Sequence, residues 1–274
     1  MPSRPDVALA MTVHDPDGRL YDLTAAHQPA LNALYAGVVA VYSPATDPAT
    51  VSLLREQGVA VWPQAQSAAD IGHLGQVRLA TLAAGLALAD HCQLGDHDRM
   101  LHWIMAYPHE LARVVGEVAA HDFLVLGRTD RAFATHPPAQ QETERLATHA
   151  YYLATGRAWD ITAGSRGASR RAGEALRRYS CEPSVANDGE WPLLIGRLPD
   201  LRLGYLATEG LEFETADRYA AEIAALGGRE AWMRAHYDTL PSWSFRLDMA
   251  CRTVEAIRRA SDPRYLEDAH ELAG

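Results

Sequence analysis

The sequence predicts an α/β fold: a mostly parallel sheet flanked by helices, followed by a helical C-terminal region. Short apolar runs alternate with helix-length segments over residues 7–126, as in a parallel sheet with crossover helices. After residue 138 this alternation gives way to longer helical segments. The chain of 274 residues, 48% of them hydrophobic, is long enough to bury the core of one such domain.

The expected strands are short apolar runs that end at polar or turn-forming residues. In chain order they are residues 7–13, 37–42, 59–62, 89–98 and 123–126. Parallel strands of this kind are joined by right-handed crossovers, and ligands bind outside their carboxyl ends. The segments expected at that edge are residues 14–15, 43–44, 96–98 and 127–128.

The expected helices fill the intervals between the strands and most of the second half. A short helix is expected over 31–34, and Thr46 or Asp47 caps a helix with Pro48 in its first turn that ends at Gly58. Further helices are expected at 71–88, 100–119 with an interruption at Pro108, 140–155, a segment ending near Tyr179, 215–226, and 229–260 with a break at 240–241. A Gly-rich loop at 162–173 and a polar turn at 187–192 separate some of them. We expect a ligand-binding unit over residues 1–215 and a helical region over 216–274 packed on the same domain.

The charged residues exclude several classes of enzyme. All 25 Lys+Arg positions are arginine, so the chain has no lysine. A P-loop NTPase and a protein kinase need a phosphate-binding lysine, and Schiff-base enzymes need an amine nucleophile. An anionic ligand must therefore be held by arginine, by backbone N–H groups or by a metal ion. The formal net charge of −10 lacks the basic footprint of a nucleic-acid-binding protein, so we expect no nucleic-acid partner.

The cysteines and the apolar segments indicate the compartment. Cys92, Cys181 and Cys251 lie far apart and form no CxxC pair, so neither a disulfide framework nor a structural zinc site is expected. The first residues contain no signal-peptide pattern, and no run of 18 apolar residues occurs. We therefore expect a cytoplasmic protein without a transmembrane segment.

The most specific motif is Asp96-His97-Asp98, at the end of the fourth expected strand. Side chains two residues apart in an extended chain point to the same side, so both carboxylates are expected at the strand tip. Such a pair can hold Mg²⁺ or Mn²⁺, which takes its remaining ligands from water and phosphate groups. A solvated strand end or a helix cap is the alternative interpretation of the same residues.

Other residues are candidates for binding an anion or moving a proton. Arg128 and Arg131 follow the fifth expected strand, and Arg166 and Arg170 lie in the Gly-rich loop, where arginine can contact phosphate or carboxylate through two parallel hydrogen bonds. Gly164 would let backbone N–H groups approach the same anion. Asp160 could accept hydrogen bonds from hydroxyl groups, and Asp188 and Glu190 could serve as acid or base. A solvated turn, a flexible loop and a helix cap are the respective alternatives.

Two strand–helix units, a further helix and a strand that ends in Asp-x-Asp resemble the fold of the GT-A glycosyltransferases, which use nucleotide-diphospho-sugars. Ala163-Gly164-Ser165, with Ala168 and Arg170-Arg171, resembles the acceptor loop of glucosyl- and mannosyl-phosphoglycerate synthases. Asp188-Gly189-Glu190-Trp191 resembles their acidic segment ahead of an apolar helix. The resemblance covers about residues 5–215. It departs at Ser165, where the pattern has Glu, and the chain shows no match to the third metal ligand.

The resemblance implies a metal-dependent glycosyltransferase of the hexosyltransferase type, with a GT-A-like sheet. Asp96 and Asp98 would hold Mg²⁺ or Mn²⁺ on the diphosphate of a nucleotide-diphospho-sugar. The nucleotide would contact His14, Asp15, Ser43 and Asp96. The acceptor, a small molecule that can be anionic, would face Asp188, Glu190 and the loop with Gly164, Ser165, Arg166 and Arg170, while Arg128, Arg131 and Asp160 are further candidates for its binding.

Two other functions fit the same sequence. A sugar-1-phosphate nucleotidyltransferase uses a related fold, and a catalytically inactive relative would act as a binding or assembly protein. The aromatic residues Trp232, Tyr237 and Trp243 in the helical C-terminal region suggest a surface for a homodimer.

Overall fold

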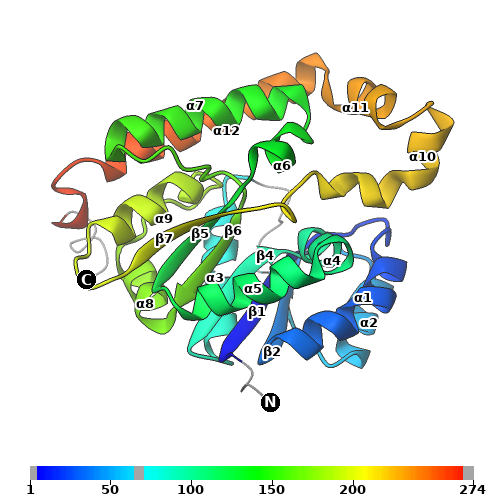
Figure 1. The fold of residues 1–274 in the computed structure, drawn as a ribbon, viewed down its shortest axis with the longest axis horizontal. Helices are drawn as coiled ribbons and strands as arrows, with labels where there is room; N and C mark the ends of the chain where they lie inside the picture. Colours follow the sequence, from blue (N-terminus) through cyan, green and yellow to red (C-terminus); the bar gives the residue numbers. More distant parts are fainter. Residues whose placement is uncertain (1–4, 65–70, 268–274) are drawn as a thin grey trace.

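The computed structural model describes residues 5–64 and 71–267, and within them seven strands form a single sheet (Figure 1). The first half supplies the parallel strands β1 (Val7–Val13), β2 (Gly37–Tyr42), β3 (Ala60–Pro63) and β4 (His91–Asp96). They are connected by α1 (Tyr21–Leu34), α2 (Pro48–Glu56) and α3 (Leu74–Leu86). The expected parallel α/β array is confirmed.

The second half extends the sheet with one reversed strand. The strand order is β3-β2-β1-β4-β6-β5-β7, where β5 is Phe123–Arg128, β6 is Ser165–Ser169 and β7 is Leu203–Thr208. Strand β6 lies antiparallel between β4 and β5, whereas β7 runs parallel to β5. The sheet is therefore mixed but mostly parallel, as the sequence predicted.

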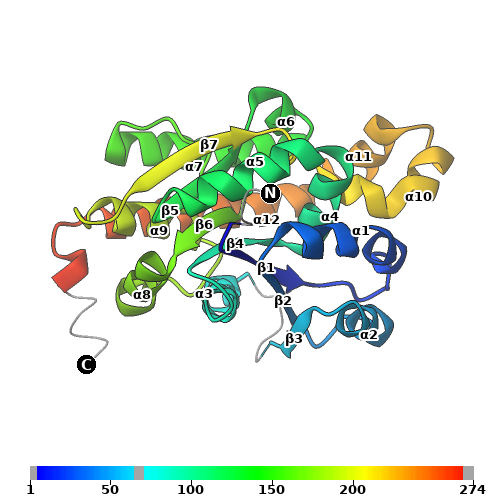
Figure 2. The same cartoon turned by 60° about the horizontal axis from the view of Figure 1, so that its bottom comes forward.

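Helices cover both faces of the sheet, and the strand residues alternate between the two layers (Figures 1 and 2). In β1, Leu9 and Met11 face a core with α1, α4 (His97–Ala106) and α5 (Pro108–Ala119). Ala10 faces the other core, with α3, α8 (Arg170–Tyr179) and α9 (Asn187–Gly196). Both sides of β1 are buried, so its run of apolar residues is continuous.

The C-terminal segments return to the sheet domain. After the 3₁₀ helix η1 (Glu214–Tyr219), the helices α10 (Ala220–Ala225) and α11 (Arg229–Tyr237) lead to α12 (Leu240–Ala260). Helix α12 lies beside α7 (Pro138–Thr155) and contacts α9 (Figure 1). The short helix α6 (Asp130–Ala134) precedes α7. No helix among the described residues is long and apolar enough to cross a membrane.

Three local predictions need correction. The helix expected at 31–34 begins at Tyr21, although Pro29 lies inside it. Proline lacks the N–H that would bond the carbonyl of Ala25, and the side chain of Gln57 donates to that carbonyl instead, with a nitrogen–oxygen distance of 3.2 Å. This substitution of one donor by another permits the longer helix.

The Gly-rich loop expected at 162–173 contains a buried strand, β6. Gly167 permits it, because a Cβ at this position would lie 2.7 Å from the side chain of Val118 on α5. The polar turn expected at 187–192 is the first part of helix α9, and its residues are buried. Both segments have a local composition that is typical of loops, but packing against distant residues gives them regular secondary structure.

Candidate functional site

Two adjoining cavities open at the carboxyl ends of β1 and β4, where a parallel sheet is expected to bind ligands. The first, here called the β1 cavity, has a volume of about 290 Å³ and includes Thr12, His14, Asp96, Asp98, Glu214 and Arg218 in its wall. The second, here called the arginine cavity, has a volume of about 200 Å³ and includes Arg78, Arg99, Gly164 and Arg246. Leu74, Asp96, Glu214 and Thr215 line both, so the two cavities form one cleft.

Asp96 and Asp98 both line the β1 cavity, but the predicted strand geometry is wrong, because Asp96 ends β4 and Asp98 lies in the first turn of α4. The hydroxyl of Thr12 donates to Asp96 Oδ1 over 2.5 Å. Asp98 accepts from the backbone N–H of Arg99 over 2.9 Å, and its Oδ2 lies 2.8 Å from a guanidinium nitrogen of Arg218. Burial, together with the nearby Glu214 carboxylate, raises the pKa of Asp98 to about 6.

The donor atoms around Asp96 and Asp98 do not make a complete metal site. Among residues 5–64 and 71–267, no group of three or more His, Cys, Asp or Glu side chains is arranged to hold a metal ion. The Oδ2 of Asp98 is paired with Arg218, which is a cation itself. The predicted Mg²⁺ or Mn²⁺ therefore does not fit the carboxylates in the arrangement that the structure shows, and no chemical step below depends on it.

Three guanidinium groups line the arginine cavity, each held by an acidic side chain. Arg78 donates to Asp188 over 3.0 Å and to Asn187 over 3.1 Å. Arg99 donates to Glu214 over 3.2 Å and also to the carbonyl of Ala163. These contacts fix the direction of both guanidinium groups, which a long, flexible side chain would not keep by itself.

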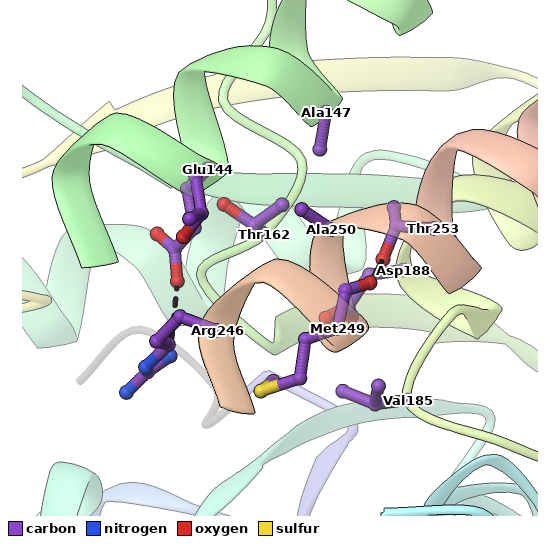
Figure 3. Close-up of a pocket in the computed structure, with 10 residues that line it drawn as sticks. Glu144, Ala147, Thr162, Val185, Asp188, Arg246, Met249, Ala250 and Thr253 are labelled. Carbon is purple, nitrogen blue, oxygen red and sulfur yellow. Dashed lines mark hydrogen bonds and ion pairs between the residues drawn. The ribbon is translucent and has the colours of Figure 1, made fainter. Parts of the chain in front are cut away.

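Arg246 reaches the same cavity from α12. Figure 3 shows its guanidinium below Glu144 of α7, with a nitrogen–oxygen distance of 3.5 Å. Both residues belong to the wall of a small cavity of about 30 Å³ between α7, α9 and α12, together with Thr162, Asp188 and Met249 (Figure 3). The arginine cavity thus receives side chains from α3, α4 and α12, three helices that are distant in the chain.

Gly164 lies where Arg78 and Arg99 meet. Its φ is +71°, and a Cβ there would lie 2.8 Å from one guanidinium nitrogen of Arg78 and 3.5 Å from one of Arg99. Glycine is the residue that adopts this backbone conformation at little cost and leaves the space empty. Gly164 therefore contributes to the cavity by leaving space for the guanidinium groups of Arg78 and Arg99.

Asp188, one of the two predicted acid/base groups, lines the arginine cavity. Its Oδ1 accepts from Arg78 over 3.0 Å and from Arg166 over 2.9 Å. Arg166 is buried and donates as well to the carbonyls of Ile161 and Ser165. Asp188 therefore joins an arginine of the cavity to a buried one.

Glu190, the other predicted acid/base group, lines neither cavity. Its carboxylate accepts from the backbone N–H groups of Cys181 and Glu182, over 2.7 and 3.0 Å, and from the hydroxyls of Ser180 and Tyr265. Burial raises the pKa of Glu190, while these donors oppose that shift. The contacts show a structural anchor for the chain between α8 and α9.

Arg128 and Asp160 form a buried ion pair that lines neither cavity. The pair has a nitrogen–oxygen distance of 2.7 Å, and Arg128 also contacts Glu144 over 2.5 Å. Burial by itself would raise the pKa of Asp160, but the guanidinium beside it lowers that pKa to about 2. Glu144 contacts Arg246 as well, so this pair supports the wall of the arginine cavity.

The structure spreads the remaining predicted residues over several places. His14 lines the β1 cavity, with its Nδ1 2.7 Å from the hydroxyl of the buried Ser43. Asp15 is buried and accepts from the Leu20 N–H and the Thr50 hydroxyl, over 3.1 and 2.9 Å. Ser43 therefore positions His14, whereas Asp15 holds the loop between β1 and α1.

Gly164 alone among the seven predicted acceptor residues lines the cleft, and Ser165, Arg131 and Arg170, like Arg128, Asp160 and Arg166, line neither cavity. Ser165 is buried in β6 and donates to the Leu94 carbonyl over 3.1 Å. Arg131 is half exposed and pairs with Glu209 and Glu212. Arg170 pairs with Asp90 over 3.2 Å, just before β4 begins and thus at the opposite end of that strand from Asp96.

The residues of the cleft that sequence reasoning missed include Arg78, Arg99, Glu214, Arg218 and Arg246. Two of them carried a signal. Arg78 is a lone charge in the otherwise uncharged helix LGQVRLATLAAGL, and Arg99 directly follows the Asp-x-Asp motif. The other three come from η1 and α12, and no local pattern marks them.

Comparison with known proteins supports the fold. No family model matches the chain, and no curated protein matches its sequence. A crystal structure of glucosyl-3-phosphoglycerate synthase from Mycobacterium tuberculosis is similar, with 14% identity, a TM-score of 0.52, and 82% of each chain covered. The same enzyme in complex with uridine diphosphate matches with 15% identity and a TM-score of 0.51, covering 74% of this chain and 71% of that one.

A third similar structure is this enzyme in complex with Mn²⁺, uridine diphosphate and phosphoglyceric acid, with 15% identity and a TM-score of 0.50. It covers 74% of this chain and 68% of that one. These likenesses and the mixed, mostly parallel sheet agree with the fold that the sequence resemblance implied. The chain therefore has the GT-A-like fold of these structures.

Proposed function

We propose that the protein is a glycosyltransferase that moves a sugar from a nucleotide-diphospho-sugar to a small anionic acceptor. The observation that carries the proposal is the two-part cleft at the carboxyl ends of the strands. One part holds His14, Asp98 and Arg218, the other holds three arginines, and the parts meet at Asp96 and Glu214. This arrangement suits two ligands that react at their point of contact.

The β1 cavity suits the donor. In a GT-A-like sheet the nucleotide lies over the tips of the first strands, where His14 lines the cavity and is held by Ser43. The diphosphate would then lie beside Arg218, and the sugar at the junction of the cavities. Glu214 lines this junction, and a carboxylate oxygen is a suitable acceptor for sugar hydroxyl groups.

The arginine cavity suits an anionic acceptor. Arg78, Arg99 and Arg246 present guanidinium groups, whose planar forks match the oxygen atoms of phosphate and carboxylate. The chain has no lysine, so arginine is its only strongly basic side chain for this purpose. A similar structure contains phosphoglyceric acid, which carries a phosphate and a carboxylate, and we propose an acceptor of this chemical class.

Transfer breaks the bond between the anomeric carbon and the diphosphate oxygen and forms a bond to an acceptor hydroxyl oxygen, whose proton is released. Negative charge grows on the departing diphosphate, so a cation fixed beside it lowers the barrier. Arginines fixed around the acceptor hold its hydroxyl close to the anomeric carbon. In this proposal Asp188 is a positioning residue for Arg78, since it accepts from Arg78 and Arg166 at once.

Calorimetric titration of the full chain with UDP and GDP, each with Mn²⁺ and with EDTA, tests the proposal. We expect saturable binding of at least one nucleotide, and release of that nucleotide from its sugar conjugate when phosphoglyceric acid is added. Absence of binding under every condition would overturn it. Pyrophosphate release from a nucleoside triphosphate and a sugar phosphate would instead identify a nucleotidyltransferase. Nucleotide binding without sugar transfer to any anionic acceptor would identify a catalytically inactive relative.

A further inference from the structure

An arginine occupies the position beside Asp98 where the sequence predicts a metal ion. Arg218 comes from η1, in the C-terminal part of the chain, and its guanidinium lies 2.8 Å from Asp98 Oδ2. Both side chains are less than one-fifth exposed and line the β1 cavity with Asp96 and Glu214. The cation that compensates these acidic groups is thus supplied by the chain itself.

The surroundings keep Arg218 charged and oriented. Burial by itself would lower the pKa of Arg218, but the carboxylates of Asp98 and Glu214 raise it by more, so the net shift is upward and favours the charged guanidinium. Arg19 lies over the ring of the next residue, Tyr219, at 4.6 Å from the ring centre, which supports η1 at the rim of the cavity. The position of Arg218 therefore does not depend on a bound ligand.

A guanidinium can bind two anions at the same time. Its five N–H groups form a planar fork, and one of its nitrogens contacts Asp98. Within the described ranges, the Nε of Arg218 is buried and has no hydrogen-bond partner, so it is not the donor for a ligand. The N–H groups of the two terminal nitrogens are the donors that a second anion in the β1 cavity would contact while Arg218 stays paired with Asp98.

We propose that Arg218 supplies the positive charge that binds the diphosphate of the donor, in the place of a divalent ion. Asp98 is then the positioning residue that holds this guanidinium, and Arg218 stabilises the charge that develops on the departing nucleoside diphosphate. The inference rests on the proposed function, because it assigns the diphosphate subsite of the same cleft. It changes the role of the Asp-x-Asp motif from metal binding to the orientation of an arginine.

The test is nucleotide binding by the full chain after removal of metal ions with EDTA. UDP and GDP serve as probes, and affinity is measured by calorimetry in EDTA and again with Mn²⁺. We expect the dissociation constant to change less than about threefold between the two conditions. Arg218→Ala should weaken binding in EDTA by about 100-fold, the loss typical for a desolvated charge-assisted contact. Arg218→Lys should recover part of it, because it keeps the charge but not the planar fork.

Arg234→Ala is the matched control, since Arg234 lies on α11, is two-thirds exposed and pairs with the exposed Glu230 over 3.6 Å. Its affinity should equal that of the wild type, and thermal unfolding checks that each variant is folded. Binding that requires Mn²⁺ would overturn the inference and leave the proposed function standing. Wild-type-like affinity of Arg218→Ala in EDTA would overturn it as well. Failure to bind a nucleotide under any condition would instead overturn the proposed function.

Discussion

Gly164→Ala probes both the backbone at Gly164 and the guanidinium groups of the arginine cavity. Gly164 has φ +71°, a conformation that costs a residue with a Cβ about 1–2 kcal/mol. The new Cβ would lie 2.8 Å from a guanidinium nitrogen of Arg78, so the guanidinium has to move away. This movement strains its 3.0 Å contact with Asp188, a charge-assisted hydrogen bond worth about 1.5–3 kcal/mol.

The chain offers a matched control in Gly156, which has φ +72° and no atom within 4 Å of an added Cβ. Gly156→Ala should therefore lower the free energy of unfolding by the backbone cost alone, about 1–2 kcal/mol. Gly164→Ala should lower it by about 2–4 kcal/mol, because the cost at Arg78 is added. Equilibrium unfolding in urea measures both values.

Binding of phosphoglyceric acid provides the second measurement. Displacement of Arg78 should weaken this anion by about tenfold in Gly164→Ala, whereas Gly156→Ala should bind like the wild type, since Gly156 ends α7 and lines neither cavity. Equal losses of stability in the two variants, together with unchanged anion affinity, would refute the reasoning. Arg78 would then tolerate the added Cβ without moving.

Three further predictions concern the carboxylates. Glu190→Gln should lower the free energy of unfolding by about 1–3 kcal/mol, because two buried N–H groups lose a charged acceptor, and nucleotide affinity measured by calorimetry should not change. Asp160 has a folded-state pKa of about 2, below the ordinary value of 3.8 for aspartate, so its pair with Arg128 contributes stability that is complete above pH 4 and is lost as the pH falls toward 2. That contribution is about 2 kcal/mol and should be missing from the acid unfolding curve of Asp160→Asn. The pH dependence that Asp98 contributes to stability has the opposite sign, because its folded-state pKa of about 6 lies above the ordinary value of 3.8. The stability of the wild type relative to Asp98→Asn should therefore fall as the pH rises from 4 to 6, and a rise over that range, measured by urea unfolding, would contradict the assignment.

The first half of the fold follows from local patterns. Each strand from β1 to β5 is an apolar run bounded by polar residues, and Pro108 separates α4 from α5 where the sequence predicted an interruption. Asp96 ends β4, so strand topology brings it to the cleft, whereas Asp98 reaches the cleft from the first turn of α4, which the expected strand over 89–98 did not predict. These features depend on hydrophobic periodicity and on proline geometry, and a few consecutive residues are enough to show both.

The second half does not follow in this way. Ser165–Ser169 has the composition of a loop, yet it pairs with β4 and β5 in the middle of the sheet. Asp188 and Glu190 were predicted together as acid/base groups, but α9 turns them to different surroundings, an arginine pair and a structural loop. Sequence separation alone does not reveal such a difference, since it depends on which elements pack against each face of a buried helix.

The sequence by itself determined the α/β class, the strand tips at which the cleft opens, the carboxylate of Asp96 at the end of β4, and the absence of lysine, which leaves arginine as the strongly basic side chain. The tertiary structure decided which arginines take that part. Arg78, Arg218 and Arg246 come from α3, η1 and α12, and each is directed by an acidic partner, respectively Asp188, Asp98 and Glu144. A guanidinium on a flexible side chain acquires a position only when a distant carboxylate fixes it, so the charge of the cleft is a property of the folded chain.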